Sequence, residues 1–192
     1  MLKIIELKSY INQYRPFLIF LLKFFSVYIG LTLLYQFYLN QYDNPITFQV
    51  DGFTDAVATQ TQQLLSFLNY NATTAPHEHQ ASIKLFINNV YVARIVEGCN
   101  ALSVIILFAA FVVAFTGKIK HTVLFILGGS LLIHILNVLR IALLSIALLH
   151  YPEQEEFLHG VVFPLFIYGV VFGLWVIWVN KFSSYAGKTA KQ

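Results

Sequence analysis

Charged residues and cysteine are both scarce in this sequence. Asp, Glu, Lys and Arg make up 11% of its 192 residues, whereas hydrophobic residues make up 58%. Because a soluble domain carries about 25% charged residues, this composition excludes an ordinary soluble protein. The chain has a single cysteine, which excludes an internal disulfide, a Cys-x-x-Cys redox pair and a cysteine-based zinc site. That cysteine is therefore either a structural thiol or a nucleophile.

The hydrophobic residues are concentrated in four long runs. A helix needs about 20 apolar residues to cross ~30 Å of hydrocarbon. We therefore predict an all-α integral membrane protein with about four transmembrane helices, at residues 17–39, 101–116, 122–149 and 160–180. The first run is too long for the core of a signal peptide, which indicates an uncleaved membrane anchor.

The third run is longer than a membrane requires. As a straight helix, residues 122–149 would extend about 42 Å. We expect this helix to tilt, to break at Gly128-Gly129-Ser130, or to project beyond the membrane surface.

The distribution of basic residues predicts the orientation in the membrane. Lys and Arg accumulate in the cytoplasmic flanks of transmembrane helices. They occur in residues 1–16, in the link after the second run and in residues 181–192, whereas residues 40–100 and 150–159 are mainly acidic. We therefore predict cytoplasmic termini and two extracytoplasmic segments. The basic residues form no compact patch, so we expect the lipid bilayer and no nucleic acid as a partner.

The long segment 40–100 has the pattern of a small α/β unit outside the membrane. Helical spacing of apolar residues predicts a helix within Phe53–Tyr70, and Asn71–Gln80 is typical of an exposed loop. Alternating apolar residues in Ser82–Val96, around an Asn88-Asn89 turn, predict a β-hairpin. The second strand of this hairpin would run directly into the segment that contains the cysteine.

Three reactive side chains are predicted to meet on one side of the membrane. Cys99, Arg140 and His159 each lie 19–22 residues from the nearest lysine on the cytoplasmic side. That spacing corresponds to about 28–33 Å of helix, or roughly the thickness of the hydrocarbon core. We therefore expect a thiol, a guanidinium and an imidazole at the outer boundary.

A polar stripe precedes the arginine on the same predicted helix. His134, Asn137 and Arg140 follow one another at about one-turn spacing on an otherwise aliphatic segment. Ionisable residues inside a membrane are functional candidates by default. Asn137 is expected either to form a hydrogen bond between helices or to orient Arg140, and His134 is expected to form a packing hydrogen bond.

The residues around the cysteine supply further candidates for supporting or substrate-binding roles. Glu97 is expected to pair with Arg94 or with Arg140. Ser103 lies one turn below the thiol and either donates to a substrate or bonds back to its own helix. Asn100 directly follows Cys99. We expect no cofactor and no metal site.

These side-chain types can cleave a peptide bond. The thiolate is the reactive form of cysteine, and a nearby cation favours it. An imidazole can deprotonate the thiol and then protonate the leaving amine. A guanidinium can stabilise the oxyanion of a tetrahedral intermediate. The set is therefore that of a membrane cysteine protease or transpeptidase.

Three motifs carry a resemblance to a known family: Glu97-Gly98-Cys99-Asn100-Ala101-Leu102-Ser103, Asn137-Val138-Leu139-Arg140-Ile141 and Phe157-Leu158-His159-Gly160. Over roughly residues 96–179 the chain resembles the exosortase/archaeosortase family of membrane-embedded cysteine transpeptidases. It is most similar to the short bacterial exosortases of the XrtF type.

The resemblance implies roles and partners. It implies Cys99 as nucleophile, His159 as its acid/base partner and Arg140 as a stabiliser of the thiolate or the transition state. It implies membrane-anchored substrates with a C-terminal sorting signal, made of a short motif, a transmembrane helix and a basic cluster. Cleavage would occur outside the bacterial cytoplasmic (inner) membrane, followed by transfer to another carrier.

Two readings without catalysis remain open. A membrane scaffold would bind a partner helix through the stripe of His134, Asn137 and Arg140. A lipid- or glycan-handling helper would use Arg140 to bind an anionic head group. Only the enzyme requires a reactive Cys99, so the reactivity of this thiol separates the three readings.

Overall fold

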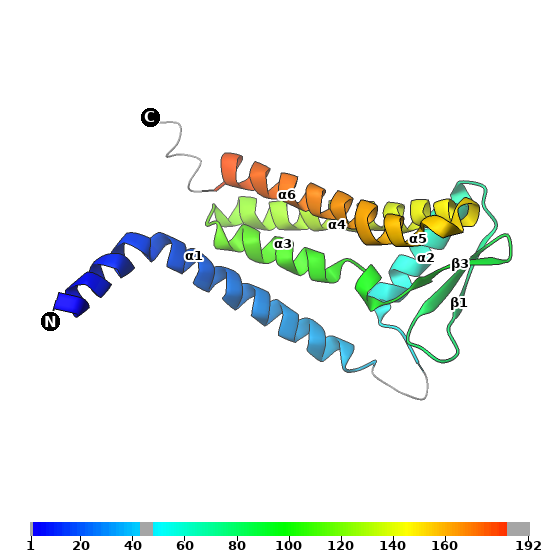
Figure 1. Cartoon of the computed structure of the whole chain (residues 1–192), viewed down its shortest axis with the longest axis horizontal. Coiled ribbons are helices and arrows are strands. Elements are labelled where there is room, and N and C mark those ends of the chain that lie inside the picture. Colours follow the sequence, from blue (N-terminus) through cyan, green and yellow to red (C-terminus); the bar gives the residue numbers. More distant parts are fainter. Residues whose placement is uncertain (1, 43–47, 184–192) are drawn as a thin grey trace.

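A computed structural model describes residues 2–42 and 48–183. The chain is mostly helical, with a bundle of long helices at one end and a small sheet at the other (Figure 1). The bundle contains α1 (Leu2–Leu39), α3 (Leu102–Ala114), α4 (Ile119–His150) and α6 (Phe163–Lys181). Helix α1 starts and α6 ends at the same end of the bundle, opposite the sheet (Figure 1).

Among the residues that the structure describes, three segments are long and apolar enough to cross a membrane, as expected of an integral membrane protein. They are Gln13–Leu39, Ile119–His150 and Pro152–Lys181. The sequence predicts about four spans, and the segment predicted as the second forms α3, an apolar helix of 13 residues. At 1.5 Å per residue, α3 is about 20 Å long, which is less than the hydrocarbon thickness.

Helix α4 is continuous, so the predicted alternative of a break at Gly128-Gly129-Ser130 is wrong. Its 32 residues extend about 48 Å, well beyond the ~30 Å of a hydrocarbon core. Gly129 instead permits close packing of α3. A Cβ atom on Gly129 would lie 2.3 Å from Cζ of Phe108, whereas one on Gly128 would meet nothing within 4 Å.

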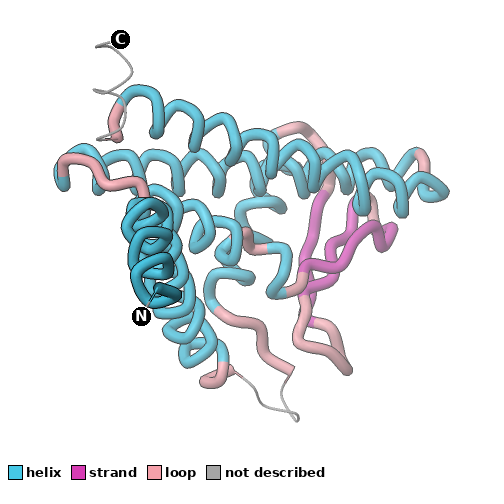
Figure 2. Tube along the Cα trace, turned by 60° about the vertical axis from the view of Figure 1, so that its left-hand side comes forward, coloured by secondary structure: helices cyan, strands magenta, loops and turns pink. Residues whose placement is uncertain are grey.

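The bundle is held together by aromatic and aliphatic packing between α3, α4 and α6. The buried cluster at this contact includes Phe108, Val112, Ile133, Val171 and Trp178. The indole of Trp178 also donates a hydrogen bond to the backbone carbonyl of Phe115, at 3.1 Å. Helix α1 packs mainly on α3 and is inclined to the layer formed by α4 and α6 (Figure 2).

The predicted hairpin is confirmed. Strands β2 (Ile83–Ile87) and β3 (Val90–Ile95) pair in antiparallel fashion around Asn88 and Asn89. Both asparagines have positive φ values, 52° and 64°, as a two-residue type I′ turn requires.

A third strand lies where the sequence predicts an exposed loop. Strand β1 (Ala72–Pro76) pairs with β2, so the prediction of a loop over Asn71–Gln80 is wrong for these five residues. The segment is too short and too weakly alternating to be recognised alone. Its pairing is determined by the buried side chains of β2, whose residues alternate between buried and partly exposed. The strand order is β1-β2-β3, which leaves β3 at an edge.

The sheet and α2 (Gly52–Phe67) are packed onto the C-terminal half of α4. Asp51 caps α2 by accepting hydrogen bonds from the backbone amides of Phe53 and Thr54, at 3.0 and 3.1 Å. The buried core here combines residues of α2, the sheet and α4: Val57, Ala58, Leu65, Leu85, Ile87, Ile95, Val138, Ile141 and Ala142. Fully burying one such aliphatic side chain contributes about 1.5–3 kcal/mol, so the small unit is firmly attached to α4.

Candidate functional site

One cavity brings together the three reactive side chains that the sequence singles out. It has a volume of about 510 Å³ and lies between β3, the C-terminal half of α4 and the chain that leads into α6. Cys99, Arg140 and His159 all line it, each from a different segment. Within residues 2–42 and 48–183, no hydrogen bond joins the thiol to either of the other two side chains.

Cys99 ends a single 3₁₀ turn, η1 (Glu97–Cys99), between β3 and α3. The next residue but one, Ala101, has φ 63° and ψ 6°, a left-handed conformation that costs a residue with a Cβ about 1–2 kcal/mol. Asn100 stabilises this reversal, because its Oδ1 accepts a hydrogen bond from the backbone amide of Leu102 at 2.9 Å. The thiol is therefore held in a tight, strained turn at the start of α3.

A buried polar network lies behind this turn. Asn100 is 3% exposed, and its Nδ2 donates to the hydroxyl of Tyr35 at 2.8 Å and to Oγ1 of Thr54 at 3.2 Å. The Tyr35 hydroxyl in turn donates to Oε1 of Glu97 at 2.6 Å. Oγ1 of Thr54 donates to Oδ2 of Asp51 at 2.5 Å. Helix α1, the cap of α2 and the cysteine turn are thus joined by direct hydrogen bonds.

The prediction that Glu97 pairs with Arg94 or with Arg140 is wrong. Its carboxylate accepts a hydrogen bond from Tyr35, and neither Arg94 nor Arg140 is bonded to it. Arg94 instead donates to Gln80. Sequence reasoning missed Tyr35 because it is one of 11 tyrosines and 18 phenylalanines in an apolar chain, and nothing in its spacing distinguishes it from a lipid-facing aromatic.

Asn137 joins the cysteine turn to α4. It is fully buried, and its Nδ2 donates to the backbone carbonyl of Cys99 at 2.6 Å. Its Oδ1 accepts a long hydrogen bond, 3.5 Å, from Nη1 of Arg140. Asn137 therefore contacts Arg140, and its second hydrogen bond joins α4 to the cysteine turn. Nε of Arg140 is buried and has no partner among the described residues.

The three residues of the predicted polar stripe do not act together: Asn137 and Arg140 contact each other, whereas His134 contacts α2. Nε2 of His134 lies 2.7 Å from Oε1 of Gln60, so this histidine belongs to the contact between α2 and α4, as its expected packing role requires.

Ser103 is exposed and does not line the cavity, and its side chain forms no hydrogen bond within the described part of the chain. The expected bond from Ser103 back to its own helix is therefore not found.

His159 lies in an irregular turn that the sequence does not reveal. Residues Leu158–Val162 form a π-helical turn, η3, in which the amide of Phe163 bonds to the carbonyl of Leu158. It follows the short elements η2 (Pro152–Gln154) and α5 (Glu155–Phe157). Such π turns are frequent at functional sites. The exposed imidazole shares the cavity with Glu155, which lies one turn earlier.

The described residues offer no cluster of three or more potential metal ligands. Glu78, which the sequence places between two histidines, is engaged with Lys84 of β2. Lys84 donates to its two carboxylate oxygens at 2.6 and 2.7 Å, and this interaction holds the pKa of Glu78 below its ordinary value.

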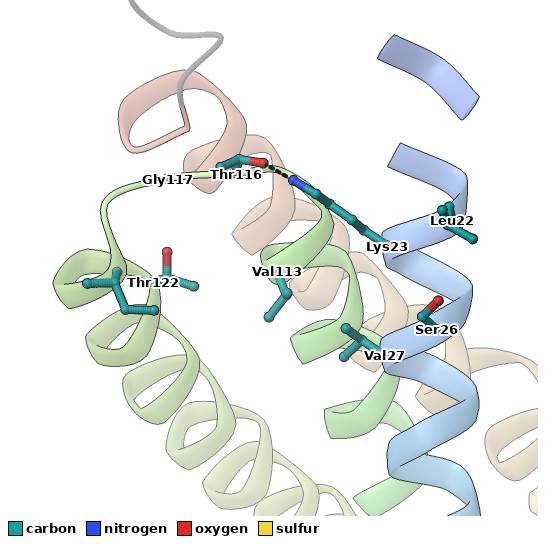
Figure 3. Close-up of a pocket in the computed structure, with 9 residues that line it drawn as sticks. Leu22, Lys23, Ser26, Val27, Val113, Thr116, Gly117 and Thr122 are labelled. Carbon is teal, nitrogen blue, oxygen red and sulfur yellow. Dashed lines mark hydrogen bonds between the residues drawn. The ribbon is translucent and has the colours of Figure 1, made fainter. Parts of the chain in front are cut away.

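A second cavity lies at the opposite end of the bundle. It has a volume of about 520 Å³ and is lined by α1, α3 and the start of α4. Lys23 reaches from α1 towards the end of α3, and its Nζ donates to Oγ1 of Thr116 at 2.8 Å (Figure 3). Its lining contains no cysteine, histidine or carboxylate.

The architecture and the first cavity define an integral membrane protein with a cysteine, an arginine and a histidine around one cavity. Residues 16–179 match the model of the transmembrane exosortases (Exosortase_EpsH), and the chain belongs to this family. The match begins well before residue 96, where the resemblance of the motifs begins, and it includes most of α1 and all of residues 40–100. No curated protein and no solved structure matches the chain.

Proposed function

We propose that this protein is a membrane-embedded cysteine transpeptidase. It would cleave the C-terminal sorting signals of exported proteins on the outer side of the cytoplasmic membrane and transfer them to another carrier. The observation that carries this proposal is the single cavity that Cys99, Arg140 and His159 line from three different segments. Membership of the exosortase family supports the same reaction class.

In the proposed reaction, His159 takes the proton of the Cys99 thiol, and the thiolate attacks the scissile carbonyl carbon. Arg140 stabilises the resulting oxyanion. When the C–N bond breaks, His159 returns the proton to the leaving amine, and a thioester remains on Cys99. An amine, a hydroxyl or water then attacks the thioester while His159 accepts its proton, and the thiol is restored.

Asn137, Asn100 and Glu97 act in this proposal as positioning residues. Asn137 holds the backbone of the nucleophile and one guanidinium nitrogen through the same side-chain amide. Asn100 and Glu97 hold the turn against Tyr35. Ser103 has no role in this mechanism, because it lies outside the cavity.

We propose four spans, with α3 as the second, short span. Its packing against α1, α4 and α6 in one bundle supports this assignment. Both termini would be cytoplasmic and the cysteine cavity extracytoplasmic, because basic residues flank one end of the bundle. The proposed organisation is tail 1–16, spans 17–39, 101–116, 122–149 and 160–180, outer segment 40–100, and tail 181–192.

The proposed substrates are membrane-anchored proteins that end in a short motif, an apolar helix and a basic cluster. Within the family we place the chain among the short bacterial members of the XrtF type, which its three motifs resemble most. The protein would act within the lipid bilayer, without a cofactor and without nucleic acid.

The scaffold reading is disfavoured by the contacts of the polar stripe. It requires these side chains to be available to a partner helix. His134 is bonded to Gln60 and Asn137 is fully buried, so two of the three stripe residues are already engaged within the chain.

The test is the rate at which Cys99 reacts with a membrane-impermeant thiol reagent in intact cells across pH. We expect rapid labelling from outside that slows in Arg140→Ala and in His159→Ala, because a nearby cation and a base favour the reactive thiolate. Cys99→Ala, which has no thiol, is the control. An unreactive thiol in all variants would contradict the enzyme and leave the scaffold or the lipid-binding helper.

A further inference from the structure

We propose that the free edge of β3 binds the cleavage segment of the substrate as an additional strand of the sheet. This inference rests on the proposed function and names how the substrate is recognised. The occupant is an extended peptide segment of another protein, the part that precedes that protein's own membrane helix.

The position of the cavity relative to β3 is the first observation. In the described structure, β3 is paired with β2 on one side only. All seven consecutive residues from Val90 to Val96 line the cysteine cavity. Successive side chains of a strand point to opposite faces of the sheet. A cavity that every residue of a strand contacts therefore runs along the edge of that strand, where the backbone N–H and C=O groups lie.

The irregularity within β3 is the second observation. Leu85 pairs with Ala93 and Phe86 with Tyr91, so Val92 is an extra residue in the ladder. Such bulges bend a strand and are over-represented beside active sites. Exposed edges are usually protected against unwanted pairing. Here the edge borders a cavity that contains a thiol, which indicates a functional opening.

The opposite wall of the cavity fits the side chains of an extended peptide. It is formed largely by apolar residues near the end of α4, including Leu144, Leu148 and Leu149. In strand addition, backbone hydrogen bonds provide affinity and pockets for alternate side chains provide specificity. We therefore expect apolar side chains at every second residue of the cleavage segment, on the side that faces α4.

The direction of β3 explains how the scissile bond reaches the thiol. The strand ends at Ile95, and Cys99 follows after Val96 and a 3₁₀ turn. A peptide paired along the edge is guided towards the cysteine turn, with Arg140 and His159 on the same cavity. The edge thus aligns the peptide, and the three reactive side chains meet it where the pairing ends.

Disulfide trapping tests this inference, because Cys99→Ala leaves a chain without cysteine. Single cysteines are placed at Tyr91, Val92, Ala93 or Arg94 in that background. The probe is a reporter in which an exported soluble domain is fused to the C-terminal motif, helix and basic cluster of a host protein. Single cysteines are scanned through the reporter's cleavage segment, and disulfides are formed by mild oxidation in membranes.

We expect disulfides whose yield alternates along the reporter with a period of two residues. Moving the cysteine by one residue along β3 should move the preferred partner by one residue along the reporter. The matched controls are Thr73→Cys and Thr74→Cys on β1, the opposite edge of the same sheet, which should form none.

The outcomes separate this inference from the proposed function. A reporter that is not processed by the wild type, or is still processed by Cys99→Ala, overturns the function and the inference with it. Processing that depends on Cys99, combined with β3 disulfides that lack the two-residue period or equal those of β1, overturns the inference alone. Disulfides between two copies of the chain, unchanged by the reporter, would assign the edge to self-association and overturn it as well.

Discussion

The side-chain amide of Asn137 donates a hydrogen bond to the backbone carbonyl of Cys99, with 2.6 Å between Nδ2 and O. Asn137 lies one turn before Arg140 on α4, and its Oδ1 accepts from the guanidinium. A single fully buried amide therefore connects the backbone of the proposed nucleophile to the cation beside it.

Asn137→Asp should impair both stability and processing. Aspartate keeps the size of the side chain but loses the donor, so a carboxylate oxygen would face the Cys99 carbonyl. Leaving buried groups unsatisfied costs about 1–3 kcal/mol. The midpoint of thermal unfolding in detergent and the rate of reporter processing measure the two effects. Asn89→Asp, at the exposed hairpin turn, is the control and should change neither.

Arg140→Lys should slow processing strongly while the protein remains folded. Lysine keeps the charge but cannot reproduce the planar fork that contacts Asn137 and faces the cavity. Losing one oxyanion donor typically slows turnover by on the order of 100-fold or more. Processing kinetics of the reporter provide the measurement, with Arg15→Lys as the control. A variant as active as the wild type would remove Arg140 from the mechanism.

Tyr35→Phe should loosen the cysteine turn. The change deletes the donor to Glu97 and one acceptor of Asn100, and leaves the ring in place. We expect unfolding to become easier by about 1–3 kcal/mol and processing to slow. Tyr28→Phe is a matched control on the same helix, because the Tyr28 hydroxyl forms no hydrogen bond within the described residues. If the two variants behave alike, the network does not support the turn.

Ala101→Gly and Ala101→Val should have opposite effects. The residue has φ 63°, where glycine is free of strain and a β-branched side chain is strongly disfavoured. Glycine is expected to preserve or raise the unfolding midpoint, and valine to lower it by the equivalent of more than about 1–2 kcal/mol. Thermal unfolding in detergent is the measurement. Equal stability of both variants would show that the turn is not strained.

Gly129→Ala should destabilise the bundle, whereas Gly128→Ala should not. The added Cβ at residue 129 meets the ring of Phe108, and the one at residue 128 meets nothing. Overpacking of this kind costs about 1–3 kcal/mol. Unfolding midpoints of both variants test the difference, and Phe108→Leu should restore part of the loss in Gly129→Ala. Equal midpoints for the two alanine variants would contradict the close packing of α3 on α4.

The features predicted correctly from the sequence depend on local spacing. The hairpin follows from alternation around Asn88-Asn89, and counting helix rise from the basic flanks places Cys99, Arg140 and His159 together. The features missed depend on distant partners. Strand β1 exists because β2 offers an edge to pair with. Tyr35 reaches Glu97 across 62 residues of sequence, which no local pattern encodes.

The unbroken course of α4 would set a fixed height for the proposed reaction. The same continuous helix carries Arg140 about 31 Å from its first residue. One residue inserted into α4 before Arg140 would move the arginine by about 1.5 Å along the helix axis and rotate it by roughly 100° about that axis. For a substrate anchored in the same bilayer, α4 acts as a ruler. Under the proposed function, only a protein whose cleavage segment begins at the matching distance from its own membrane helix would be cut.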